Sequence, residues 1–192
     1  MKKDIILSGV GGQGILSIAT IIGDAATRAG LNLKQAEVHG MSQRGGEVES
    51  GLRLSDTEIH SDLVPLGAAD IILSMEPMEA LRYLPFLHEG GFVVTSSSPF
   101  RNIDPYPEEA VRAALAGLDR VITLDLDGIT RTNAIPQSAN VVLLGAAAGI
   151  IGILSPEQLQ QSIRNIFAAK GERVVEMNLK AFEIGREYGG RQ

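Results

Sequence analysis

The 192-residue sequence contains no cysteine, no tryptophan, three tyrosines and five phenylalanines. Without cysteine, these residues form no disulfide, offer no thiolate nucleophile and bind no iron–sulfur cluster through cysteine sulfur. Aromatic residues make up 4% of the chain and apolar residues in total 44%. The core must therefore be built from isoleucine, leucine, valine and alanine.

Positive charge is also scarce. The formal net charge is −6 and no run of lysine and arginine is present, so the composition argues against nucleic acid as a partner. The longest apolar stretch, residues 141–154, is short of a membrane span and diluted by glycine, so we expect a buried helix there and no membrane association. Met1-Lys2-Lys3-Asp4 leads into an apolar strand without a signal-peptide core. We therefore expect a cytoplasmic protein.

The three histidines, His39, His60 and His88, are scattered along the chain. They show none of the spacings typical of metal ligands. We assign neither a metal ligand nor a catalytic residue to this chain.

The most informative segment is the glycine turn Gly9-Val-Gly-Gly-Gln-Gly14, which has G-x-G-x-x-G spacing between an apolar strand and an amphipathic helix. In this motif Gly9 is expected to allow a sharp turn, Gly11 to let a phosphate approach the backbone, and Gly14 to let the helix pack close to the strand. Unpaired N–H groups at the helix start attract an anion. The turn predicts a phosphate-binding site formed by Gly9, Gly11, Gly12, Gln13 and Gly14. A tight turn without a ligand is the competing interpretation.

A second polar, glycine-rich loop, with the sequence HGMSQRGG, occupies residues 39–46. Its Arg44 offers a planar fork of donors that suits a phosphate, a substrate carboxylate or a carboxylate on a partner chain. Ser42, Gln43 and Gly45 surround it, and we predict that all four take part in binding. A solvated turn with a structural arginine is the alternative. Since both loops follow strands, we expect them at the same edge of the sheet.

Strand-like apolar segments alternate with segments of helical periodicity along the chain. The expected strands cover residues 4–8, 31–38, 48–55, 70–74, 90–95 and 121–125. The expected helices cover residues 12–29, 108–118, 129–133, 139–151, 156–170 and 172–188, and one begins near Pro77.

This alternation predicts a single α/β domain over residues 1–192. We expect it to be Rossmann-like, with a mostly parallel sheet covered by helices on both faces and with a C-terminal helical layer. A small antiparallel insertion is expected near residues 48–61, in which residues 58–61 return as a hairpin partner.

The glycine turn is also typical of nicotinamide and flavin dinucleotide enzymes. Such enzymes need an acid at the tip of the second strand to bind the ribose hydroxyls. Glu37 is roughly in that place, but no acid or base suited to hydride transfer follows it. A free-standing dinucleotide-binding protein and an interaction scaffold without a ligand therefore stay open as alternatives.

Several segments together resemble a known family. The sequences GVGGQGI at 9–15, EVHGMSQRGG at 37–46, SDLVP at 61–65 and EPMEALR at 76–82 are similar to the gamma-type subunit of 2-oxoacid:ferredoxin oxidoreductases. The second is most similar to the small (beta) subunit of indolepyruvate ferredoxin oxidoreductase. NAIPQSAN at 133–140 also fits, and the resemblance covers nearly the whole chain.

The resemblance implies an oxidative decarboxylation, in which a 2-oxoacid, coenzyme A and oxidised ferredoxin give acyl-coenzyme A, carbon dioxide and reduced ferredoxin. Enzymes of this family use thiamine diphosphate, Mg²⁺ and iron–sulfur clusters. This chain has no cysteine and no recognisable segment for Mg²⁺ and thiamine diphosphate. The resemblance therefore implies that these groups lie on a large catalytic partner subunit, and that ferredoxin is reached through the complex.

The chain is then expected to be a non-redox subunit that is inactive alone. Its glycine turn suits the diphosphate of coenzyme A. The resemblance implies indolepyruvate or a related aryl or branched 2-oxoacid as the substrate.

Overall fold

The computed structural model describes residues 1–40, 45–101 and 103–190. Within them, one sheet has the strand order β2-β3-β1-β4-β5-β6. The strands that run parallel to one another are β1 (Lys2–Val10), β4 (Ala69–Ser74), β5 (Leu87–Ser96) and β6 (Val121–Leu124). In contrast, β3 (Glu47–Ser55) is antiparallel to both of its neighbours, β1 and β2 (Asn32–His39). The expected mostly parallel sheet is confirmed.

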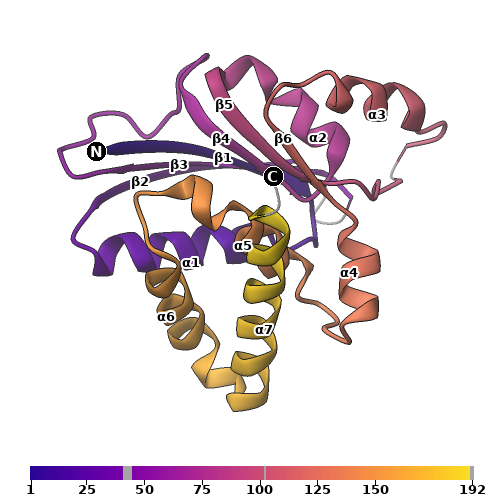
Figure 1. The fold of residues 1–192 in the computed structure, drawn as a ribbon. Coiled ribbons are helices and arrows are strands. Elements are labelled where there is room, and N and C mark those ends of the chain that lie inside the picture. The colour runs from indigo at the N-terminus through magenta and orange to yellow at the C-terminus, as the bar shows by residue number, and fades with distance from the viewer. Residues whose placement is uncertain (41–44, 102, 191–192) are drawn as a thin grey trace.

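Helices cover both faces of the sheet (Figure 1). One face carries α1 (Ile15–Arg28), α5 (Ala139–Ile151), α6 (Pro156–Phe167) and α7 (Glu172–Gly189), with the short helix η2 (Ala168–Lys170) between the last two. The other face carries α2 (Pro77–Arg82) and α3 (Glu108–Ala116), and η1 (Leu84–Phe86) follows α2. A further helix, α4 (Leu126–Thr132), follows β6. The expected C-terminal helical layer is therefore formed by α5, α6 and α7.

The strands alternate between two apolar cores. In β1, Ile5 faces the core under α1 and α5, whereas Ile6 faces the core under α2 and α3. In β4, Ile71 likewise faces the core under α1 and α5, and Ile72 faces the core under α2 and α3. Because both faces of these strands are buried, their sequences are continuously apolar.

Helices α5 and α7 pack backbone against backbone. A Cβ added to Gly145 would lie 2.1 Å from the carbonyl oxygen of Phe182, and one added to Gly185 would lie 2.0 Å from that of Val142. The glycines therefore set the distance between the two helices, because any side chain at these positions would force them apart. This contact holds α7 beside the amino terminus of α5.

The expected hairpin over residues 58–61 is wrong. Those residues form no strand, and β3 instead pairs along its whole length with β2 and β1. The alternation seen in residues 48–55 is typical of a half-buried strand, yet β3 lies between two strands and residues 50–55 are all buried. The antiparallel strand is thus β3, which pairs with β2 on one side and with β1 on the other.

A buried ion pair joins β1 to β3 and fixes the connection toward β4. Arg53 donates from Nε to Asp4 Oδ1 at 2.9 Å and from Nη2 to Oδ2 at 3.3 Å. Its Nη1 donates to the carbonyl oxygens of Ser61 at 3.0 Å and Leu63 at 3.1 Å. The Asp4 side chain has no exposed surface, although Lys2 Nζ also approaches it at 2.7 Å. One guanidinium therefore satisfies a buried carboxylate and two carbonyl oxygens.

We predict that Arg53→Met lowers the free energy of unfolding by about 3 kcal/mol, because it leaves a buried carboxylate without its bidentate partner. Urea unfolding followed by circular dichroism measures this. The control is Asp56→Asn, which breaks an exposed pair with the N-terminal ammonium group and should leave the midpoint unchanged. Equal midpoints for the two variants would contradict a structural role for the Arg53 pair.

Candidate functional site

The glycine loop, residues 9–14, begins inside β1 rather than after it. Gly9 pairs with Val48 in the β1–β3 ladder, so the expectation that Gly9 makes the turn is wrong. A Cβ on Gly9 would lie 2.8 Å from Gln13 Oε1, and glycine is therefore needed there to make room for the Gln13 side chain. The turn itself lies at Gly12, whose φ of +101° favours glycine.

Gly14 is the N-cap of α1 and has a φ of +83°. A Cβ at Gly14 would lie 2.7 Å from Nδ2 of Asn140, and that same Nδ2 donates to the Gly14 carbonyl oxygen at 3.1 Å. The expectation that Gly14 lets the helix pack close to the strand is wrong, because Asn140 is what a Cβ at Gly14 would meet. The close approach is between the amino terminus of α1 and that of α5.

Gln13 connects the glycine loop to the end of β4. Its Oε1 accepts a hydrogen bond from the Val10 N–H at 2.7 Å, and its Nε2 donates to the Met75 carbonyl oxygen at 3.4 Å. Because both ends of the amide are engaged within the protein, the geometry favours a positioning role for the Gln13 side chain over direct contact with a ligand.

The amino terminus of α1 is open to an anion. The helix has no acidic residue in its first turn and no side-chain cap. The amides of Ile15 and Leu16 have no acceptor among the described residues. Free amides and the helix dipole give this end partial positive charge.

A pocket of about 650 Å³ opens at this helix end, and we call it the glycine-loop pocket. Its lining comes from the end of β1, the glycine loop, the start of α1, the described start of the second loop and β3. The lining residues are Val10, Gly11, Gly12, Gly14, Ile15, Leu16, Ser17, His39, Gly40 and Val48. The Gly11 N–H donates to the Gly46 carbonyl oxygen at 2.8 Å, which ties the loops together. The expectation that the two loops share one edge of the sheet is confirmed for their described residues.

Part of the second loop lies outside the described residues. This holds for Met41, Ser42, Gln43 and Arg44, so binding by Ser42, Gln43 and Arg44 stays a prediction. Gly45 is described, with a φ of +78° that favours glycine.

A second pocket, of about 690 Å³, lies on the other side of the glycine loop, and we call it the α5 pocket. It shares Gly12, Gly14 and Ser17 with the glycine-loop pocket. The amino terminus of α5, η2 and α7 form much of the rest of its lining, together with Met75, Asp127 and Phe167. The glycine loop therefore separates two cavities.

Sequence reasoning missed a polar network at the start of β3. The Tyr83 hydroxyl donates to Glu47 Oε1 at 2.5 Å, and Arg82 Nε donates to Glu79 Oε2 at 2.8 Å. Burial and the neighbouring carboxylate of Glu47 raise the pKa of Glu49, and the same two causes raise that of Tyr83. No local pattern indicates this network, because its members come from β3 and α2.

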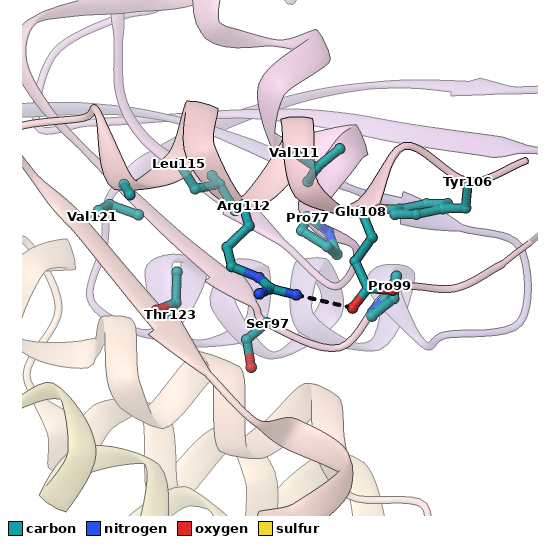
Figure 2. Close-up of a pocket in the computed structure, with 11 residues that line it drawn as sticks. Pro77, Ser97, Pro99, Tyr106, Glu108, Val111, Arg112, Leu115, Val121 and Thr123 are labelled. Carbon is teal, nitrogen blue, oxygen red and sulfur yellow. Dashed lines mark hydrogen bonds and ion pairs between the residues drawn. The ribbon is translucent and has the colours of Figure 1, made fainter.

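A third pocket, of about 330 Å³, lies between α3 and β6 (Figure 2). Val111 and Leu115 form part of its apolar wall. Its cation, Arg112, donates to Glu108 at 3.2 Å, and Arg101 donates to the same carboxylate at 2.6 Å. Because its charges are paired and the glycine loop does not line it, this pocket is a poor candidate for a phosphate site.

Within the described residues, no group of three or more histidine, aspartate or glutamate side chains is arranged to hold a metal ion. The helices there are all too short or too polar to cross a bilayer.

The mixed sheet with a glycine loop opening α1 defines a Rossmann-like α/β domain. Within that class, the chain belongs to the pyruvate ferredoxin/flavodoxin oxidoreductase family, whose model matches residues 4–188. It is 38% identical over 198 residues to the indolepyruvate oxidoreductase subunit IorB of Pyrococcus horikoshii, covering 96% of this chain and 95% of the relative. It is 30% identical over 192 residues to the 2-oxoglutarate synthase subunit KorC of Methanothermobacter thermautotrophicus, covering 97% and 95%.

Solved structures show the same fold. A keto/oxoacid ferredoxin oxidoreductase gamma subunit from Geobacter sulfurreducens matches with a TM-score of 0.69 and 25% identity over 99% of both chains. A 2-oxoglutarate:ferredoxin oxidoreductase from Magnetococcus marinus, solved with 2-oxoglutarate, coenzyme A and succinyl-CoA, matches with a TM-score of 0.78 at 21% identity. That match covers all of this chain and 31% of the other. The resemblance inferred from the motifs is thereby confirmed.

We predict that Gly14→Ala destabilises the protein more than Gly30→Ala. Both positions have a left-handed φ, which costs an alanine about 1–2 kcal/mol, but nothing lies within 4 Å of a Cβ at Gly30. The additional loss of stability in Gly14→Ala comes from the clash between the new Cβ and the Asn140 side chain. A double-mutant cycle with Asn140→Ala should therefore show coupling to Gly14→Ala and none to Gly30→Ala. Equal losses at both glycines would show that the contact between α1 and α5 is unimportant.

Proposed function

We propose that this chain is the non-redox subunit of a 2-oxoacid:ferredoxin oxidoreductase, and that it holds the diphosphate of coenzyme A in the glycine-loop pocket. Family membership along nearly the whole chain supports the enzyme class. The relatives named above are subunits of indolepyruvate and 2-oxoglutarate enzymes. The higher identity to the indolepyruvate subunit favours an aryl 2-oxoacid as the substrate.

One observation carries the coenzyme assignment. The amino terminus of α1 has no cap and no acid, and it opens into a pocket lined by three glycines of the loop. Backbone amides at such a helix end, unshielded by side chains, are suited to bind a diphosphate. Coenzyme A is the substrate of the proposed reaction that carries one.

The remaining cofactors do not fit this chain. It has no cysteine for an iron–sulfur cluster. Both oxygens of the buried Glu76 carboxylate already accept hydrogen bonds, from the Glu79 amide and the Tyr106 hydroxyl, so this carboxylate is not free to bind a cofactor. We therefore assign thiamine diphosphate, Mg²⁺ and the clusters to a large partner subunit. Ferredoxin meets that subunit within a cytoplasmic complex.

No observation favours the dinucleotide enzyme that the glycine spacing also allows. Such enzymes place the second strand beside the first, whereas here β3 separates β1 from β2. Glu37, the candidate ribose-binding acid, therefore lies two strand spacings, about 9–10 Å, from β1. Its carboxylate is 3.3 Å from His39 Nε2.

We predict that Leu16→Glu stabilises the fold and weakens coenzyme A binding. Leu16 lies in the first turn of α1 and lines the glycine-loop pocket. A negative charge there favours the helix dipole by about 0.3–1 kcal/mol, but it repels a bound phosphate, so we expect about a tenfold loss of affinity. Thermal melts and calorimetric titration measure the two effects, with Leu16→Gln as the uncharged control. Unchanged affinity in the Glu variant would place the phosphates elsewhere.

We also predict that the purified chain is colourless and transfers no electrons from a 2-oxoacid. The reason is that its residues offer no cluster ligands. The measurement is reduction of a viologen dye with indolepyruvate and coenzyme A, before and after addition of the large subunit. Dye reduction by this chain alone would reject the non-redox assignment.

A further inference from the structure

The α5 pocket contains a buried hydroxyl without a partner. Ser138 lines this pocket, has no exposed surface, and its Oγ has no hydrogen-bond partner among the described residues. It is the N-cap of α5 and makes no capping hydrogen bond with its side chain. Native proteins satisfy nearly all buried polar groups, so an unpaired hydroxyl at a cavity indicates a missing partner.

Positive charge converges on the same cavity. The 13-residue helix α5 has no acid in its first turn, and the amides of Ala139 and Asn140 have no acceptor among the described residues. Lys170 also lines the cavity, with its Nζ 5.4 Å from the centre of the Phe167 ring. It has no carboxylate partner within the part of the chain that the structure describes. Asp127 is the carboxylate among the described lining residues.

Part of the remaining wall is apolar, beside the polar side chains of Gln13, Ser17 and Asn178. Met75, Phe167, Val174 and Met177 line the cavity between the glycine loop and α7. A ligand that fills this pocket therefore combines an anionic group with an apolar body.

The segment leading into α5 is conformationally strained. Ala134 has a φ of +52° and Gln137 a φ of +65°, and both are residues with a Cβ, for which left-handed conformations are unfavourable. Gln137 lines the pocket directly before Ser138. Strained residues of this kind cluster at ligand sites, and here they lie in the NAIPQSAN motif, to which the proposed coenzyme site assigns no role.

We propose that the α5 pocket is a second anion-binding site, for a phosphate or carboxylate carried on an apolar body. The Ser138 hydroxyl and the first amides of α5 hold the anion, and Lys170 neutralises it. Two ligands of the proposed reaction have this chemistry: coenzyme A through its ribose 3′-phosphate, and an aryl 2-oxoacid through its carboxylate. The choice of these two ligands rests on the proposed function, whereas the site itself does not.

The test is calorimetric titration of the full-length chain with coenzyme A, 3′-dephospho-coenzyme A and phenylpyruvate. Ser138→Ala and Lys170→Met should each weaken binding of one anion by about tenfold, the loss expected for one charge-assisted hydrogen bond. If these variants bind coenzyme A more weakly but bind 3′-dephospho-coenzyme A as before, the anion in the site is the 3′-phosphate. If they bind phenylpyruvate more weakly, the anion is the carboxylate.

Two matched controls separate binding from folding. Thr95→Val removes a second buried hydroxyl that has no partner among the described residues and lines none of these cavities. Lys34→Met removes an exposed lysine of β2 that is paired with Asp62. Neither should change affinity. Because the Ser138 hydroxyl is unpaired, Ser138→Ala should leave the melting temperature unchanged or raise it.

Unchanged affinity for every probe in both pocket variants would overturn this site, and a lowered melting temperature of Ser138→Ala would give that residue a structural role instead. If coenzyme A binding is lost in Leu16→Glu and these variants change the binding of neither coenzyme A nor phenylpyruvate, the coenzyme site stands and this one fails. If phenylpyruvate binding depends on Ser138 while coenzyme A does not bind, this site stands and the coenzyme assignment fails. Binding of no probe to the wild-type chain overturns both.

Discussion

The candidate site depends on a single close contact, between the glycine loop and the start of α5. Gly14 has no side chain, so Asn140 can place its Nδ2 on the Gly14 carbonyl oxygen. This contact brings together the amino termini of two helices that are 126 residues apart in sequence. The partial positive charges of the two helix amino termini then lie close together on either side of the loop. Their repulsion costs free energy in the absence of a ligand. A bound anion offsets that cost, so the arrangement is suited to negatively charged ligands.

A second set of glycine contacts, between α5 and α7, positions another part of the α5 pocket lining. Gly145 and Gly185 let α5 and α7 touch along their backbones, and the start of α7 follows directly on η2, which carries Lys170. The position of the lysine therefore depends on small residues more than ten positions away from it. Stability and ligand geometry are coupled here through packing distance rather than through polar contacts.

Local patterns were sufficient for the architecture but not for the long-range contacts. The helix over Ala139–Ile151 and the buried strand at β4 follow from apolar periodicity, and both are confirmed. Gly9 and Gly14 were recognised as special, yet their partners, Gln13 and Asn140, are side chains whose placement depends on tertiary packing. The pairing of β3 was missed for the same reason, since strand order is a property of the whole sheet. Ser138 carries no local signal, because an unpaired hydroxyl becomes visible only when burial is known.

The division of tasks within the proposed enzyme follows from what this chain's fold can and cannot hold. A domain without cysteine has no thiolate ligands for clusters. The first turns of α1 and α5, where we propose that anions bind, contain no acidic residue. Electron transfer and coenzyme binding need different environments, since clusters require thiolates whereas a diphosphate requires backbone donors and positive potential. Separating them on two chains lets each site be optimised without conflict. In the proposed complex, the pockets on either side of the glycine loop are the surface that this subunit would present to ligands shared with a partner subunit.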